Sequence, residues 1–123
     1  MRLFDTYSHT VREFVPAHHP VRLYVCGVTP YDTTHVGHAF TYVFFDVLIR
    51  YLEFLGHRVR YVQNVTDVDD DILRRAKELG VPWEELVREQ MALYVEDMAA
   101  LNVQPPDVLP RATQEIPEMI QII

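Results

Sequence analysis

The sequence predicts an α/β fold in which parallel strands are covered by helices, with a small hairpin at the N-terminus. Two short apolar runs, 21–26 and 58–65, flank one long and mostly apolar segment, 36–55. Short runs of this kind are typical of strands, and the longer segment is typical of a helix. A strand, a helix and a second strand within about 45 residues make a βαβ unit, whose crossover is right-handed in nearly all cases.

Composition restricts the class of protein. The 123 residues fit one domain at most, and 49% hydrophobic with 24% charged residues is ordinary for a soluble globular protein. A net charge of −7 with scattered basic residues disfavours a protein that binds nucleic acid mainly through charge. The single cysteine excludes an internal disulfide and favours a reducing compartment. We find no signal-peptide core and no membrane span, so we expect a cytoplasmic protein that does not bind a membrane.

The first 34 residues predict a hairpin, a linker and one core strand. The alternating runs Leu3–Thr6 and Val11–Val15 predict a hairpin or a pair of edge strands. Two prolines make 16–20 a linker. Five of the six residues in Val21–Cys26 are apolar, so we expect a strand that is covered on both faces, followed by a loop over 27–34.

The long segment from about Val36 to Leu55 predicts a helix that Gly56 ends, because glycine adopts the left-handed conformation at low cost. Its polar residues form a single narrow stripe, and we expect such a helix to be covered on most sides, by a sheet and by something else. The stripe consists of Asp46, Arg50, Glu53 and His57.

The remaining elements are a strand and three helices. Arg58–Val65 predicts the second core strand, Asp69–Leu79 a helix that Gly80 ends, and Pro82–Leu101 a third helix. Ile116–Ile123 begins another helical pattern and gives the chain an apolar end, which we expect other polypeptide to cover. In the third helix, the apolar residues that we expect to face the core are Leu86, Leu93, Val95, Met98 and Leu101. We divide the chain into a hairpin and linker (1–20), a βαβ unit (21–80) and a helical segment (81–123).

Two histidines stand where the long helix begins. His35 and His38 lie three residues apart around Gly37, directly after the loop that follows the first core strand. Helix-start N–H groups attract anions, and imidazoles can donate hydrogen bonds to phosphate oxygens. Gly37 leaves room for the flat face of a ligand to approach the backbone. The pattern indicates a nucleotide-phosphate site, although a pair of surface histidines would produce the same four-residue motif.

Cys26 and the acidic loop after the second strand are the other candidates. A lone cysteine is more often a small buried apolar residue than a ligand, and the chain has no spacing that completes a four-ligand zinc site. The run Thr66–Asp71 holds four carboxylates. We favour helix capping over metal binding for these carboxylates, because no calcium-loop spacing follows. The loop nevertheless follows the strand next to Cys26, at the end of a parallel sheet where ligands bind.

Taken together, three ordered motifs resemble the cysteine-activating class I ligases, the family of cysteinyl-tRNA synthetase and of the cysteine:glucosaminyl-inositol ligase of mycothiol biosynthesis. The motifs are Leu23–Asp32, His35–His38 and Asn64–Asp70, and the resemblance continues through Glu96–Leu101 and Pro110–Met119. It implies the N-terminal portion of a Rossmann-like catalytic domain that joins cysteine to AMP and then transfers the cysteinyl group to tRNA.

The resemblance also implies site residues. Cys26 would be the first ligand of a zinc ion that holds the substrate thiolate, and His35 and His38 would contact ATP phosphates. The residues implied to line the ATP and aminoacyl-adenylate pocket are Gly27, Thr29, Tyr31, Gly37, Thr66 and Asp67. ATP would bring Mg²⁺, and the partners would be cysteine, ATP and tRNA. The family's other zinc ligands and its lysine-bearing ATP motif match nothing in this chain, so we do not expect these 123 residues to turn over alone.

Three alternatives remain open. The acceptor is open, because the sequence matches the mycothiol ligase at some positions and the synthetase at others. Closer to the mycothiol ligase are Pro30, Gln63 and position 40, where phenylalanine stands instead of arginine. Closer to the synthetase are the segments Arg50–Gly56 and Pro110–Met119. A small nucleotidyltransferase would use the histidines without zinc. A non-catalytic binding module would self-associate through its apolar end, Met119–Ile123.

Overall fold

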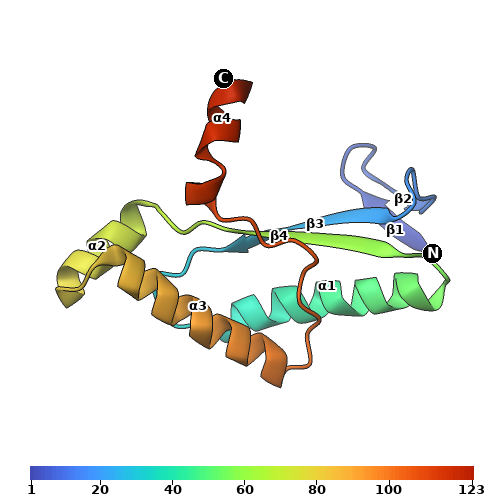
Figure 1. The fold of residues 1–123 in the computed structure, drawn as a ribbon. Coiled ribbons are helices and arrows are strands. Elements are labelled where there is room, and N and C mark those ends of the chain that lie inside the picture. Colours follow the sequence, from blue (N-terminus) through green and yellow to red (C-terminus); the bar gives the residue numbers. More distant parts are fainter.

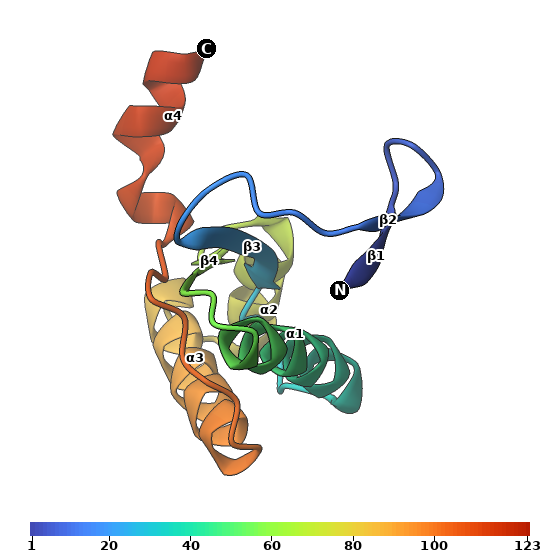
Figure 2. The ribbon, with the colours of Figure 1, turned by 90° about the vertical axis from the view of Figure 1, so that its right-hand side faces the viewer.

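The computed structural model describes all 123 residues. A short parallel sheet carries its packed helices on one side, and the C-terminal helix projects on the other (Figure 1). Strands β3 (Val21–Val28) and β4 (Val59–Val65) pair in parallel, and helix α1 (Val36–Phe54) connects them. Helices α1 and α3 (Trp83–Ala100) lie on the same side of this strand pair (Figures 1 and 2). Helix α2 (Asp70–Leu79) packs against α3, and the predicted βαβ unit is confirmed.

The β3–β4 pair is covered on one face only. Val21 and Val25 of β3, and Tyr61, Gln63 and Val65 of β4, are buried against the helices. The alternate side chains of both strands lie on the opposite, open face: Arg22, Tyr24 and Cys26 from β3, and Arg60, Val62 and Asn64 from β4. Our expectation that the first strand is covered on both faces was therefore wrong for this chain.

A third parallel segment extends the sheet beyond β4. Isolated bridges join Val62 to Val108 and Val65 to Arg111, both parallel. The N–H groups of Gln63 and Val65 donate to the carbonyl oxygens of Val108 and Pro110, at 3.1 and 2.8 Å. The predicted helical segment 81–123 therefore also contains a stretch, 107–111, that lies beside β4.

Helix α1 buries a narrow face. Its buried residues are Tyr42, Asp46, Ile49 and Leu52, so part of the polar stripe points into the structure rather than away from it. The carboxylate of Asp46 accepts from Arg50 Nε at 2.6 Å and from the Gln104 N–H at 2.9 Å. Our expectation that α1 is covered on most sides was wrong here, because large apolar side chains are exposed along its other faces: Phe40, Phe44, Val47, Tyr51 and Phe54.

The other helices match the predicted bounds closely. Asp69 caps α2 by accepting from the Ile72 N–H at 2.9 Å, and Gly80 ends α2 with φ 70°. Of the five residues of α3 expected to face the core, Leu86 and Met98 are buried, whereas Leu93, Val95 and Leu101 are exposed. Its buried residues are Leu86, Val87, Met91, Tyr94 and Met98. A 3₁₀ turn η1 (Ala112–Gln114) leads to helix α4 (Ile116–Ile122), which projects away from the helical layer (Figure 1).

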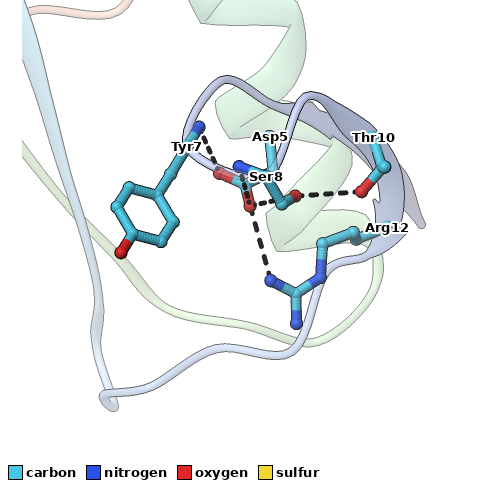
Figure 3. A network of polar contacts seen from close by, with 5 residues as sticks. All are labelled: Asp5, Tyr7, Ser8, Thr10 and Arg12. Atoms are coloured by element: carbon cyan, nitrogen blue, oxygen red, sulfur yellow. Dashed lines mark hydrogen bonds and ion pairs between the residues drawn. The ribbon is translucent and has the colours of Figure 1, made fainter.

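The predicted N-terminal hairpin is present and stands apart from the body (Figure 2). Strands β1 (Arg2–Asp5) and β2 (Thr10–Glu13) pair antiparallel. The Asp5 carboxylate organises the turn by accepting from Ser8 Oγ at 2.6 Å, from two backbone N–H groups and from Arg12 (Figure 3). These bonds, chiefly the one from the Ser8 hydroxyl, lower the pKa of Asp5. None of the helices combines the length and apolar character needed to cross a bilayer.

Candidate functional site

The start of α1 is held by its two histidines. His35 is the N-cap, and its Nδ1 accepts from the Gly37 N–H at 3.0 Å. His38 Nδ1 accepts from the His35 N–H at 3.4 Å, which completes a reciprocal capping box. The two rings stack with their centroids 4.0 Å apart. Because each Nδ1 is an acceptor, each neutral ring carries its proton on Nε2, and that N–H is the donor left for a ligand.

Burial and the neighbouring ring favour the neutral form of His38. Partial burial lowers its pKa, and the nearby His35 lowers it further. A protonated His38 could not accept the His35 N–H through Nδ1, so the capping box also requires the neutral ring. The helix start therefore offers neutral N–H donors beside its own positive dipole end.

Gly37 is required by His35 itself. A Cβ at position 37 would lie 2.8 Å from His35 Cε1 and 3.0 Å from His35 Nδ1. A side chain there would push the His35 ring away from the backbone N–H that it caps. We had explained this glycine by the approach of a ligand; the structure gives it a role within the motif.

The strand end that carries Cys26 is irregular. Val25 lies opposite Gln63 and Val28 lies opposite Val65, so β3 advances by three residues where β4 advances by two. This extra residue makes a β-bulge, a feature that redirects side chains at strand ends. At the bulge the two backbones touch, because a Cβ on Gly27 would lie 1.4 Å from the Asn64 carbonyl oxygen. Only glycine fits at that position.

Cys26 is a free, exposed thiol on the open face of the sheet. Our first reading of a lone cysteine, as a small buried residue, is therefore wrong. Its carbonyl oxygen accepts from the buried Tyr42 hydroxyl at 3.4 Å. Nowhere do three or more His, Cys, Asp or Glu side chains gather to hold a metal ion. A zinc site needs about four N or S ligands, so the residues of this chain do not by themselves fit zinc, and we derive no step through it.

The loop after β4 uses its carboxylates structurally. The Asp67 carboxylate is buried and accepts from both the N–H and the hydroxyl of Thr113, at 2.9 and 2.6 Å. Asp69 caps α2, and Asp70 and Asp71 occupy its first turn. The capping interpretation of this acidic run is confirmed for these three residues, while Asp67 instead ties the loop to η1. Thr66 continues the pairing, since its N–H donates to the Val28 carbonyl at 3.0 Å.

The remaining predicted residues lie between these two strand ends and the helix. Thr29 is half-buried and Tyr31 is exposed in the loop before α1, where the Tyr31 N–H donates to the Thr29 carbonyl at 3.0 Å. A groove of about 270 Å³ opens beside His35, between the start of α1 and the end of α3. Neither Cys26 nor Thr66 lines it. The structure thus brings the predicted residues to one end of the sheet but does not enclose them in one pocket.

A buried hydrogen-bond chain that we did not predict lies under this end of the sheet. The Tyr61 hydroxyl donates to Gln63 Oε1 at 2.9 Å, and Gln63 Nε2 donates to the Tyr94 hydroxyl at 2.6 Å. Burial raises the pKa of Tyr61 to about 12 and also raises the pKa values of Tyr42 and Tyr94. These phenols stay neutral and act as fixed dipoles. The sequence gives no periodic signal for such a network, since its members come from two elements, β4 and α3, that are far apart in sequence.

Parallel strands whose carboxyl ends meet a histidine-capped helix start define a class of α/β domains that bind ligands at that edge. Residues 13–123 match the family model described as the tRNA synthetases class I (C) catalytic domain. The chain belongs to this family, as the three motifs had indicated.

Curated relatives of two kinds match the whole chain. A cysteine--tRNA ligase of Dehalococcoides mccartyi is 44% identical over an alignment of 124 residues, which covers 100% of this chain and 27% of the relative. An L-cysteine:1D-myo-inositol 2-amino-2-deoxy-alpha-D-glucopyranoside ligase of Mycobacterium tuberculosis is 48% identical over 123 residues, 100% of this chain and 30% of that protein. The chain therefore spans less than a third of the length of these relatives.

Solved structures share the fold. A Mycobacterium tuberculosis methionyl-tRNA synthetase bound by methionyl-adenylate matches with a TM-score of 0.67 and 27% identity, over 73% of this chain and 18% of that one. A second structure of that enzyme, in complex with methionyl-adenylate, matches with a TM-score of 0.63 and 26% identity, over 68% of this chain and 17% of that one. The Rossmann-like fold implied by the resemblance is confirmed.

Proposed function

We propose that this chain is the N-terminal portion of a catalytic domain that activates cysteine with ATP. The observation that carries the proposal is the histidine-capped start of α1 beside the Cys26 strand end, in a chain that matches two kinds of cysteine ligase along its whole length.

In the activation step, a carboxylate oxygen of cysteine attacks the α-phosphorus of ATP. A new O–P bond forms, the bond to the β-phosphate bridge breaks, and pyrophosphate leaves with the electron pair. The Nε2–H groups of His35 and His38 donate to phosphate oxygens as negative charge shifts onto them, and the helix dipole adds to this stabilisation. No protein nucleophile is needed, so the contribution of these residues is positioning and charge stabilisation.

We propose that residues at the two strand ends and in the loop before α1 border the cysteinyl-adenylate: Cys26, Gly27, Thr29, Tyr31, Thr66 and Asp67. Cys26 would supply one soft ligand to a zinc ion. The ion's other ligands are not among these residues. For Asp67 the proposed role is indirect, because both carboxylate oxygens are already bonded to Thr113.

The second step transfers the cysteinyl group to an acceptor, and we propose tRNA. The acceptor oxygen would attack the carbonyl carbon of the adenylate, and AMP would leave. A specific observation favours an amine acceptor as the second candidate: the sugar–inositol ligase is 48% identical, against 44% for the tRNA ligase. Pro30 and Gln63, which favour that ligase, are both fully buried, so neither position would contact an acceptor directly.

The test is cysteine-dependent exchange of pyrophosphate into ATP. The 123 residues are assayed alone and in a chimera, where they replace the matched 124-residue segment of the Dehalococcoides ligase. We expect exchange from the chimera with cysteine and none with serine. A folded chimera that exchanges pyrophosphate with neither amino acid would refute the proposal. The acceptor is then identified by comparing two activities in chimeras built on each relative. One is the charging of tRNA, and the other is the acylation of a glucosaminyl-inositol amine.

A further inference from the structure

Two arginines lie opposite each other on the open face of the sheet, near the start of its strands. Arg22 of β3 is the register partner of Arg60 of β4, and both side chains are exposed. Like charges on facing positions of neighbouring strands repel each other, and this repulsion destabilises a sheet. An anion bound between the two guanidinium groups would remove the repulsion.

Neither of these guanidinium groups forms an ion pair within the chain. The five ion pairs of the structure involve other arginines, namely Arg12, Arg50, Arg74, Arg75 and Arg88. Carboxylates are not scarce, because the chain has 18 acidic residues against 11 basic ones. The segment beside β4 contains Asp107, yet its carboxylate accepts from the Tyr61 N–H at 2.7 Å. Both arginines are therefore available to an external anion.

The two arginines also line a single cavity of about 370 Å³, together with Pro20, Tyr24 and Val62. The Tyr24 hydroxyl donates to Asn64 Oδ1 at 2.8 Å, so this side chain reaches from β3 to β4 and is held there. Tyr24 is nevertheless 62% exposed, which leaves its ring open to a ligand. The cavity thus combines two unpaired guanidinium groups with one fixed aromatic ring.

This combination matches the chemistry of a nucleotide. Guanidinium groups bind phosphate oxygens through parallel hydrogen bonds, and aromatic side chains stack on bases. The cavity volume is at the lower end of the range for small-molecule sites, about 300–1,000 Å³. A strand of nucleic acid carries many phosphates, and the net charge of −7 opposes the approach of such a polyanion. The observations therefore favour a single small nucleotide.

We propose that the open face of the sheet binds a nucleoside monophosphate, with its phosphate between Arg22 and Arg60 and its base against Tyr24. This site is distinct from the predicted ATP site. Arg22 precedes Cys26 by four residues, which is about 13 Å along a strand, and the histidine-capped start of α1 follows the opposite end of β3. The inference does not rest on the proposed function.

The test is the binding of AMP to the 123-residue chain, measured by isothermal titration calorimetry at low ionic strength. We expect Arg22→Gln and Arg60→Gln each to weaken binding by about tenfold or more, the change expected when a charged hydrogen-bond donor is lost. Tyr24→Leu should weaken the binding of AMP but not that of inorganic phosphate, because only a base can stack. A folded wild-type chain that does not bind AMP at millimolar concentration would overturn the proposal.

Two control variants separate this site from general attraction and from the helix start. Arg58→Gln removes the same charge from an exposed arginine outside the cavity, and it should bind AMP as the wild type does. Equal weakening in Arg58→Gln and Arg60→Gln would overturn the proposal. His38→Ala should retain the binding that depends on the two arginines. Binding that is lost in His38→Ala and kept in both arginine variants would place AMP at the helix start and overturn the proposal.

A further measurement requires no ligand. At low salt, Arg22→Gln and Arg60→Gln should each unfold at a higher temperature than Arg58→Gln, because only the first two relieve repulsion between facing arginines. Lower unfolding temperatures in both would show that the chain already stabilises these charges and would overturn the proposal.

Competing ligands test the assignment to a nucleotide. An oligoadenylate that binds more tightly than AMP, and that loses affinity in both arginine variants, would assign the face to a nucleic-acid strand. A polyglutamate peptide with the same behaviour would assign it to an acidic protein partner. Either result would overturn the proposal, and we expect both polymers to bind more weakly than AMP.

Discussion

The imidazoles of His35 and His38 stack at 4.0 Å between ring centroids, and both cap the start of α1 through Nδ1. This arrangement couples the structure of the helix start to the protonation of two side chains. A proton on either Nδ1 replaces an acceptor by a donor that faces a backbone N–H.

We therefore expect acid to open the start of α1. The folded-state pKa of His38 is lowered, so the unfolded chain binds more protons in the interval between the folded value and the ordinary histidine value. The contribution of His38 to stability should therefore be complete above that interval, fall as pH drops through it, and change no further below it. A titration followed by NMR should show the His38 midpoint below the ordinary histidine value. A His38 midpoint at or above that value would contradict this assignment.

Gly27→Ala should be among the most damaging single changes in the chain. The new Cβ would lie 1.4 Å from the Asn64 carbonyl oxygen, which is backbone and cannot move without separating β3 from β4. We expect a loss of about 3 kcal/mol or more in the free energy of unfolding, measured by urea denaturation. The matched control is Gly80→Ala, where nothing lies within 4 Å and only the φ of 70° opposes the change. That variant should lose about 1 kcal/mol, and equal losses in the two would argue against the close approach.

Asp46 joins α1 to the turn after α3. Asp46→Asn leaves the acceptor for the Gln104 N–H but places an amide NH₂ or an uncharged oxygen against Arg50. We expect a loss of about 1–2 kcal/mol, reduced by the partial exposure of Arg50. Glu78→Gln breaks the more exposed pair with Arg75 and should cost less than about 1 kcal/mol. Thermal unfolding of the two variants makes the comparison, and the opposite ranking would contradict it.

Thr113 holds the loop after β4 from a distance of 46 residues in sequence. Thr113→Val removes the hydroxyl that donates to Asp67 and leaves one oxygen of a buried carboxylate without that donor. The expected cost is about 1–3 kcal/mol in the free energy of unfolding. Thr41→Val, which removes an exposed hydroxyl bonded to the Gly37 carbonyl, serves as the control and should change stability by less than about 0.5 kcal/mol. If both substitutions had the same small effect, the Asp67–Thr113 contact would carry no stability.

The elements with strong periodicity could be predicted from sequence. The hairpin, β3, β4 and the helices all follow local patterns, and their bounds agree with the structure to within a few residues. The segment 107–111 could not be recognised as part of the sheet, because prolines surround it and its pairing consists of two isolated bridges to β4. The exposed apolar side of α1 could not be recognised either, since an apolar residue in sequence looks the same whether or not something covers it.

At the site, the residue types could be predicted but not their contacts. The H-x-G-H pattern indicated a helix start, and the structure adds that His35 needs Gly37 for its own ring. Asp67 looked like part of an acidic cluster, yet its partner is Thr113, which no local pattern connects to it. Asn64 was noticed only as part of a motif, because its three hydrogen bonds depend on a bulge in the opposite strand.

We propose that Cys26 and His38 of this chain act on cysteine and ATP. The most direct measurement is cysteine-dependent pyrophosphate exchange by the Dehalococcoides chimera carrying Cys26→Ala or His38→Ala, each shown to be folded. We predict that His38→Ala lowers kcat by about 10² or more, as expected for loss of a donor to developing charge. Cys26→Ala should also lower cysteine-dependent exchange, because Cys26 is proposed to border the cysteinyl-adenylate. Exchange at the wild-type rate in both variants would contradict the account.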